Sequence, residues 1–226
     1  MIWLERFLCL IFPNRCIFCD APVKGIQKAC TPCLDTIVKT DFLRICKICG
    51  RYWCTCKKLS PRFKRAVAPF VYTGSAKEGI KRFKFQKRPG YAKLLTSYMI
   101  SAFKKAGFPN PDLITCIPMY WQNQRKRGFN QAELLAKETA KYLNVPYRDL
   151  FVCTEKAKAQ HLLSASERIE NVRKSYRLKK SAISCKGKIV LIIDDVMTTG
   201  ETLNTCAKLI SRYNQVYCLT FAATQK

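Results

Sequence analysis

The sequence predicts an α/β protein in which a small N-terminal metal-binding module, residues 1–60, precedes a larger domain with a mostly parallel sheet, residues 61–226. Three observations support this prediction. Cysteines are concentrated between positions 16 and 56. Apolar runs alternate with amphipathic segments after residue 60, as they do in parallel α/β sheets. One of these runs ends at two adjacent acids and a turn of small residues, which is typical of a ligand site at the carboxyl end of a strand.

The composition limits the class of protein. A chain of 226 residues has room for one sizeable domain and one small one, and its hydrophobic content of 48% excludes a disordered chain. The formal net charge is +26. An excess of this size indicates polyanionic partners, namely nucleic acid, an anionic membrane face or phosphorylated substrates. A basic surface that is merely solvated is the alternative interpretation.

The N-terminal residues are apolar, but Glu5 and Arg6 interrupt them and Pro13 ends the run. The run is too short to span a bilayer and lacks the basic leader of a signal peptide. We therefore expect an amphipathic helix packed on the metal-binding module. Peripheral membrane contact through the aromatic residues of this segment is the alternative.

The clustered cysteines form closely spaced pairs, and two such pairs can supply the four thiolates of a tetrahedral structural zinc site. The first candidate set is Cys16, Cys19, Cys30 and Cys33. The second set, with a shorter last pair, is Cys46, Cys49, Cys54 and Cys56. Pairing across the two sets remains open, and so does a disulfide framework. The isolated thiols of the larger domain favour a reducing, cytoplasmic location. We expect one or two structural Zn²⁺ ions.

The elements of the larger domain follow from its hydrophobic periodicity, with a boundary at Ser60-Pro61. Strands are predicted where the chain is continuously apolar, at 66–72, 112–118, 149–153, 190–193 and 215–224. Helices are predicted where apolar residues recur at helical spacing, at 75–85, 91–106, 129–143 and after residue 200. Ser164 and Glu167 form a capping-box pattern that predicts a short helix at 164–172.

The segment 190–202 gives the most specific prediction of a site. Asp194 and Asp195 follow the apolar strand, and a helix begins just beyond them. Unpaired amides and the helix dipole at such a turn attract a phosphate, while paired carboxylates can accept hydrogen bonds from ribose hydroxyls. The residues expected around the phosphate are Thr198, Thr199, Gly200, Glu201 and Thr202. The segment therefore predicts a site for a ribose 5-phosphate.

Two basic segments extend this prediction. Arg125, Lys126 and Arg127 form a basic turn before the helix at 129–143, and such a turn suits pyrophosphate. Lysines, arginines and aromatic residues are interleaved at 77–93, which fits either a surface that tracks a nucleic-acid strand or the solvated face of a helix. Trp121 is expected either to stack on a base or to pack on the neighbouring helix. The candidates for DNA binding are Lys81, Arg82, Lys84, Lys87, Arg88 and Trp121.

Segment 190–202 resembles the phosphoribosyl-pyrophosphate loop of type I phosphoribosyltransferases. Together with RKRGFNQAELLAK, residues 125–137, and QHLLSASERIEN, residues 160–171, it resembles the ComF family of competence proteins, including gluconate-utilisation-associated relatives. The resemblance implies a zinc-finger region joined to a type I phosphoribosyltransferase-like domain that acts in the cytoplasm on incoming single-stranded DNA during natural transformation. The Cys-x-Cys at 54–56 departs from the two-residue spacing usual in the family.

Carried over to this sequence, the resemblance implies that Asp194 and Asp195 hold the ribose hydroxyls and that residues 198–202 cradle the 5-phosphate. Arg125 and Arg127 lie where pyrophosphate or DNA phosphates would bind. Mg²⁺ would accompany phosphoribosyl pyrophosphate, and other competence proteins, such as a DNA helicase, are the expected protein partners.

Two functions compete at this stage. One is a competence factor that acts on single-stranded DNA and keeps the phosphoribosyl-pyrophosphate pocket as a binding or regulatory site. The other is a phosphoribosyltransferase, an enzyme of the glycosyltransferase class, acting on a small nitrogenous acceptor. The net charge of +26 and the lack of a recognisable nucleobase-binding signature favour the first function. The sequence leaves enzymatic turnover open.

Overall fold

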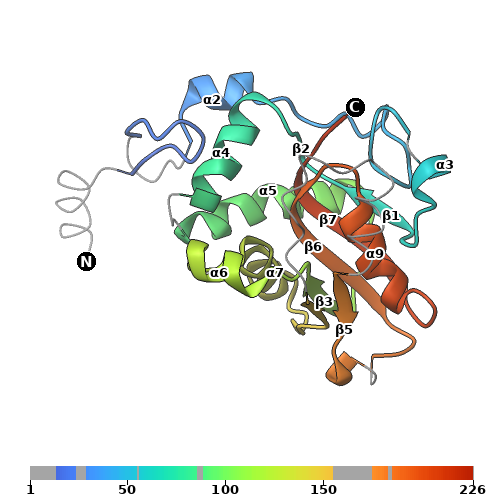
Figure 1. The fold of residues 1–226 in the computed structure, drawn as a ribbon. Helices are drawn as coiled ribbons and strands as arrows, with labels where there is room; N and C mark the ends of the chain where they lie inside the picture. The colour runs from blue at the N-terminus through green and yellow to red at the C-terminus, as the bar shows by residue number, and fades with distance from the viewer. Residues whose placement is uncertain are drawn as a thin grey trace, which may run out of the picture.

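A parallel sheet formed between residues 65 and 223 lies at the centre of the computed structural model, which describes residues 14–23, 29–54, 56–85, 89–154, 175–182 and 185–225 (Figure 1). The strand order is β1-β7-β6-β3, and β2 also pairs with β7. Every pairing in this sheet is parallel. The strands are β1 (Arg65–Val67), β2 (Phe70–Val71), β3 (Leu113–Cys116), β6 (Ile189–Met197) and β7 (Gln215–Ala223).

The two long central strands are buried on both faces, as their continuous apolar runs predict. Side chains of β6 alternate between the faces, so that Leu191 and Ile193 belong to one hydrophobic cluster while Val190 and Ile192 belong to another. β7 pairs with β6 as far as Met197, but β3 pairs with it only as far as Ile193. The predicted strand at 190–193 therefore continues through both acids instead of ending before them.

Helices cover both faces of the sheet. On one face α4 (Gly74–Phe85), α5 (Ala92–Lys105) and α7 (Gln131–Leu143) contribute to a single core. On the other face α9 (Glu201–Ile210) packs through apolar residues at helical spacing. These helices confirm the sequence prediction, with small shifts at their ends. Shorter helical segments are α6 (Trp121–Arg127), η1 (Pro89–Tyr91) and η2 (Lys180–Ala182).

Two predicted strands differ from the structure. The strand at 66–72 is divided into β1 and β2, because Pro69 between them cannot donate a ladder hydrogen bond. The strand at 149–153 is β4 (Phe151–Cys153), which lies outside the main sheet and pairs antiparallel with β5 (Tyr176–Leu178). The helix predicted at 164–172 and the N-terminal helix lie outside the described residues.

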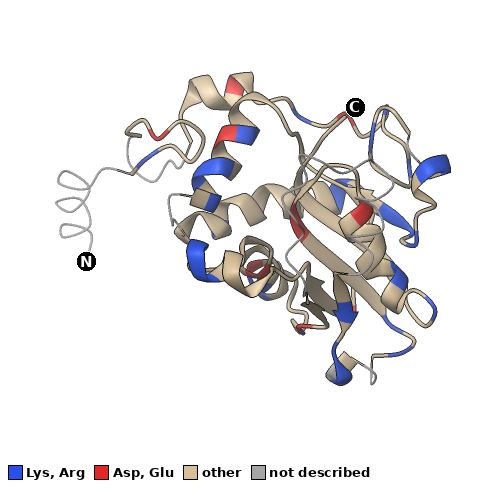
Figure 2. Ribbon diagram, in the orientation of Figure 1, with Lys and Arg blue, Asp and Glu red and all other residues tan. Residues whose placement is uncertain are grey.

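The cysteine-rich N-terminal part contacts the larger domain at two separate places. The first cysteine loop, which carries Cys16 and Cys19 and leads into α2 (Thr31–Thr36), lies beside α4 (Figure 1). Phe18 of this loop is so close to α4 that a Cβ at Gly79 would be 2.7 Å from its ring. The second loop, which ends in α3 (Cys56–Leu59), lies near β1 and α9. No helix among the described residues is long and apolar enough to cross a membrane. Lysine and arginine residues occur along α3, α4 and α6, among other elements (Figure 2).

Candidate functional site

Asp194 and Asp195 meet a small cavity at the point where β3 has ended. Neighbouring residues of a strand point to opposite faces, so two adjacent carboxylates can reach one cavity only at an edge of this kind. The Asp195 carboxylate is largely buried and forms an ion pair of 2.9 Å with the Lys84 ammonium of α4. The Asp195 backbone N–H donates to the Asp194 carboxylate at 2.8 Å. This cavity, which we call the acid cavity, has a volume of about 180 Å³ and is lined by both acids and by Lys84, Asn123 and Arg127, among others.

The pKa of Asp194 is raised to about 8, mainly by burial and secondly by the neighbouring negative charge of Asp195, while Lys84 acts in the opposite direction. Near neutral pH the Asp194 carboxyl therefore retains a proton in a large fraction of molecules. It can then donate a hydrogen bond, whereas the Asp195 carboxylate, held by Lys84, accepts one. This pair of unequal carboxyls suits a ligand with two adjacent hydroxyl groups, each of which can donate and accept.

The pKa of Asp194 predicts that stability falls as the pH rises. The unfolded chain releases the Asp194 proton near pH 4, whereas the folded protein keeps it until about pH 8, so the free energy of unfolding decreases between these two pH values. The melting temperatures at the two ends of the window should differ more for the wild type than for Asp194→Asn. The extra difference should be roughly 2–4 °C for each 1 kcal/mol of unfolding free energy that Asp194 contributes. Equal pH dependence in the two proteins would show that Asp194 ionises like an exposed carboxyl.

The predicted phosphate turn lies between β6 and α9. Thr198 and Thr199 are exposed, and Gly200 is the buried N-cap residue of α9 with φ +85°. The Glu201 N–H donates to the Thr199 hydroxyl at 3.3 Å. Glycine is required here because the left-handed conformation disfavours a side chain. Among the described residues, the lining of the acid cavity does not include this turn, which lies beyond the acids along the chain.

The predicted basic turn is instead the last turn of α6, which ends at Gly128 with φ +87°. Cations are favourable at a helix C-terminus, and seven residues are too few for a periodic pattern to reveal the helix. The Arg127 guanidinium lines the acid cavity and lies 5.2 Å from the centre of the Phe85 ring. Arg125 lies 5.4 Å from the centre of the exposed Trp121 ring and is not part of the cavity lining.

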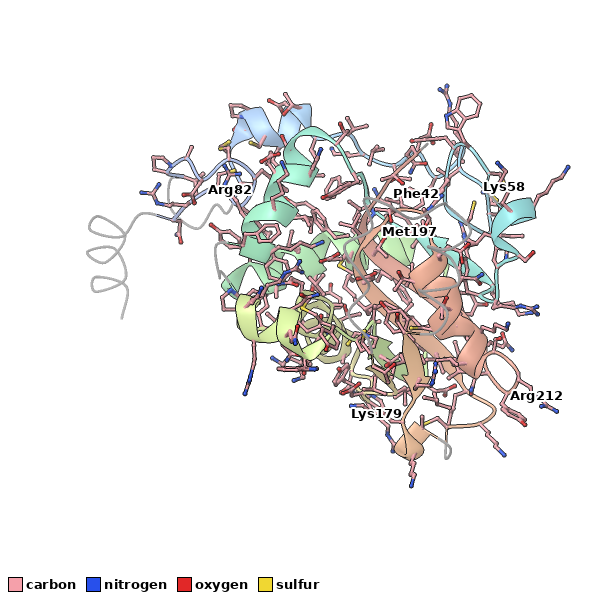
Figure 3. All side chains as sticks on the ribbon, viewed as in Figure 1. Phe42, Lys58, Arg82, Lys179, Met197 and Arg212 are labelled. Atoms are coloured by element: carbon pink, nitrogen blue, oxygen red, sulfur yellow. The ribbon has the colours of Figure 1, made fainter. Side chains whose placement is uncertain are left out.

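The residues proposed for DNA binding have different environments. Lys84 lies in the acid cavity, as described above. The Arg82 guanidinium donates to the Phe18 carbonyl at 2.7 Å and so joins α4 to the first cysteine loop (Figure 3). Lys81 is exposed and pairs with Glu78 at 2.8 Å. Trp121 is 52% exposed. Lys87 and Arg88 lie outside the described residues, and their role remains a prediction.

Several residues of the cavity were not predicted. The sequence places Lys84 among the DNA-binding candidates, and it gives no indication that Asn123, Asn130, Cys153 and Tyr176 line this site. Asn130 also caps α7, since its side chain accepts from the Ala132 N–H at 3.1 Å and donates to the Ile117 carbonyl at 3.0 Å. An asparagine before a helix is a recognisable cap in sequence, but nothing in the sequence indicates that α4, α6 and β5 meet β6.

The cysteines form two clusters, and the ligand atoms in each lie within 4.8 Å of one another. The clusters are Cys16, Cys19, Cys30, Cys33 and Cys46, Cys49, Cys54, Cys56. This grouping confirms the two predicted sets and brings the short Cys-x-Cys pair into the second. All these cysteines are free thiols. Four sulfur donors gathered in this way can hold a structural zinc ion.

Backbone N–H groups face the sulfurs in both clusters. The Cys30 N–H donates to the Cys16 sulfur at 3.3 Å, and the Ile48 N–H donates to the Cys46 sulfur at 3.5 Å. Burial opposes ionisation of Cys16 and Cys46, but these and other N–H groups lower the pKa of each to about 7. A thiolate is the form that binds zinc, so the backbone of each loop is arranged for a metal ligand.

Protein purified without chelator is expected to contain two Zn²⁺ ions per chain, one for each cysteine cluster. Replacing Cys16 and Cys19 by serine should lower the count by one and destabilise the first cysteine loop, because the metal supplies much of the folding free energy of such a loop. Metal analysis of the two proteins measures both counts. Protein that contains no zinc would contradict the assignment, and a count of one in the wild type would eliminate one cluster.

The chain is similar to a phosphoribosyltransferase family and to known competence and DNA-utilization proteins. Residues 130–223 match the family described as "Phosphoribosyl transferase domain". The DNA utilization protein YhgH of Escherichia coli K12 is 30% identical over 93% of this chain and 98% of its own length. Competence protein F of Haemophilus influenzae is 29% identical over 89% of this chain and 92% of its own. Competence protein ComFC of Bacillus subtilis is 25% identical over 86% and 88%, respectively.

Proposed function

This chain belongs to the ComF family of competence-associated proteins with a phosphoribosyltransferase domain, and from that premise we propose that it binds phosphoribosyl pyrophosphate in the acid cavity and single-stranded DNA beside it during DNA uptake. The observation that carries the proposal is the position of Arg127. Its guanidinium both lines the acid cavity and lies against the exposed Phe85 ring, so one residue connects a phosphate-sized site to a base-stacking surface.

The charges of the acid cavity support the ligand. Asp194 and Asp195 can hold the two ribose hydroxyls, while the Lys84 ammonium and the Arg127 guanidinium can face the pyrophosphate. When the ligand binds, Lys84 moves from Asp195 to a phosphate or bridges the two. Carboxylate oxygens also fit Mg²⁺, which would neutralise pyrophosphate charge while remaining bound mainly through the phosphates.

The surface beside the cavity suits a flexible nucleic-acid strand. We define the aromatic–arginine surface as Phe85, Trp121, Arg125 and Arg127, contributed by the C-terminal end of α4 and by α6. Phe85 is 66% exposed and Trp121 is 52% exposed, and each carries an arginine over its ring. Aromatic faces can stack on bases while guanidinium groups contact phosphates, a combination that is tolerant of sequence. Such side chains favour single-stranded over double-stranded DNA, because only unpaired bases present their faces.

A second cavity supports a transferase as the second candidate function. It has a volume of about 320 Å³ and shares Pro118, Met119, Asn130 and Cys153 with the acid cavity. Its lining also contains acidic groups that can accept hydrogen bonds from a nitrogenous acceptor, and these are Glu133 and Asp149. An acceptor bound there would lie next to the ribose site, as transfer requires.

The two functions are separated by one set of measurements on the wild-type protein. Calorimetry in the presence of Mg²⁺ measures the affinity for phosphoribosyl pyrophosphate. Fluorescence anisotropy with labelled DNA measures the affinity for single-stranded DNA. We expect binding of both, with a change in one affinity when the other ligand is present, because Arg127 is shared. Binding of neither ligand would overturn the proposal. Release of pyrophosphate with a small nitrogenous acceptor, without affinity for DNA, would establish the transferase instead.

A further inference from the structure

The second cysteine loop lies directly behind the phosphate turn. Arg51, which follows Cys49 and Gly50 in this loop, is only 3% exposed, and its guanidinium donates to the Thr198 carbonyl. The same carbonyl accepts from the Thr224 hydroxyl at 2.8 Å. A Cβ at Gly200 would lie 3.2 Å from the Leu59 side chain and 3.6 Å from the Arg51 guanidinium. The loop and the turn are therefore in direct contact.

Further hydrogen bonds join this loop to both sides of the turn. Asn204, in the first turns of α9, donates to the Leu59 carbonyl at 2.7 Å and accepts from the Arg62 N–H at 2.7 Å. On the other side, the Tyr52 N–H donates to the Gln225 side-chain oxygen at 2.7 Å. All the residues that form these hydrogen bonds from the loop side lie between positions 51 and 62. A change in the conformation of this segment would therefore alter several contacts with the turn at once.

The position of Arg51 depends on the cluster. Arg51 lies in the loop between Cys49 and Cys54, and its carbonyl accepts from the Cys46 N–H at 2.8 Å, so its backbone is fixed by the cysteine cluster. Four thiolates around one Zn²⁺ would carry a net charge of about −2, which would offset part of the cost of burying the Arg51 guanidinium nearby. Gly50 has φ +66°, and a Cβ there would be 2.4 Å from the Ala66 carbonyl oxygen. The loop is thus packed tightly against β1, which directs the Arg51 side chain toward the Thr198 carbonyl.

We propose that Arg51 is a positioning residue that makes the geometry of the phosphate turn depend on the metal in the second cysteine cluster. With zinc bound, the four sulfurs have one arrangement, Arg51 is held between them and the Thr198 carbonyl, and the amides of the turn are oriented for a phosphate. Without zinc the loop has no fixed geometry, and the turn loses the contacts that Arg51 and Leu59 make with it. The identity of the phosphate ligand rests on the proposed function, but the coupling between metal and turn does not.

Hydrogen–deuterium exchange of the turn, measured without any ligand, tests the coupling directly. Arg51→Gln should leave the zinc content unchanged and speed exchange of the peptide that contains residues 198–202 by about tenfold, because a buried hydrogen bond from a charged group is lost. Arg51→Lys, which retains the charge, should have a smaller effect. The matched control is Lys58→Gln, since Lys58 belongs to the same loop and is exposed. Unchanged exchange in Arg51→Gln would overturn the proposal.

The two cysteine clusters provide the second arm. Cys54→Ser with Cys56→Ser should remove one zinc ion and speed exchange of the turn, while Cys16→Ser with Cys19→Ser should remove one zinc ion and leave the turn unchanged. Equal effects of the two pairs would also overturn the proposal. Affinity for phosphoribosyl pyrophosphate should fall about tenfold in Arg51→Gln. Wild-type protein that binds no phosphoribosyl pyrophosphate would contradict the proposed function alone, because the exchange comparison needs no ligand.

Discussion

Replacing Asp194 and Asp195 together by asparagine is expected to abolish measurable affinity for phosphoribosyl pyrophosphate while the fold is retained. The hydrogen bond lost from the Asp195 carboxylate costs roughly 1.5–3 kcal/mol and the one lost from the largely protonated Asp194 roughly 0.5–1.5 kcal/mol, so the double variant should bind about 30- to 2,000-fold more weakly. Asparagine has nearly the same shape as aspartate, and both residues lie where the β3 pairing has ended, so the sheet should tolerate the change. Calorimetry with Mg²⁺ present measures the loss.

The single variants separate the two acids. Asp195→Asn removes the partner of the partly buried Lys84 ammonium and should lower both affinity and stability, whereas Asp194→Asn should lower affinity and raise stability near pH 8. Glu78→Gln is a suitable control, because this exposed glutamate also pairs with a lysine of α4 but lies outside the cavity lining. Unchanged affinity in the double variant would show that the ribose does not bind at these acids.

Local patterns were sufficient to predict the central strand, the acids, the turn and the helix after it. These features lie within 21 consecutive positions from Val190 to Ile210, so their spatial relation follows from the chain itself. The grouping of the cysteines into neighbouring pairs is the first choice from sequence, but the structure is needed to exclude pairing across the two sets. The far end of β6 was not predictable, because it depends on pairing with β7 beyond the point where β3 stops.

The basic side of the site could not be predicted, because sequence shows how many charges a segment carries but not what each charge faces. Lys81, Arg82 and Lys84 lie within one turn of α4, and yet one pairs with a glutamate, one with a backbone carbonyl and one with Asp195. The helix directs neighbouring residues to different sides, and the elements packed on each side decide their partners. This division also changes the choice of residues for a test of DNA binding, since Arg82 and Lys84 have structural or cavity contacts.

Single-stranded DNA is expected to bind at the aromatic–arginine surface through both stacking and charge. Phe85→Ala or Trp121→Ala should weaken binding by roughly 1–3 kcal/mol at high salt, where the electrostatic contribution is small. Arg125→Gln should instead reduce the slope of log affinity against log salt by about 0.7, the value for one phosphate contact on a single strand. Anisotropy titrations of labelled single-stranded DNA across a salt series measure both effects, which should be similar for unrelated sequences.

The control for these variants is a second exposed cation–aromatic pair on the same molecule. Tyr142 of α7 is 57% exposed, and the Lys104 ammonium lies 5.3 Å from the centre of its ring. Tyr142→Ala removes an equivalent side chain away from the acid cavity, so it should leave DNA affinity unchanged at every salt concentration. If Tyr142→Ala and Trp121→Ala weaken binding equally, the aromatic–arginine surface has no special role. Binding would then reflect the net charge of +26 spread over the whole chain, which attracts any polyanion without positioning it beside Asp194 and Asp195.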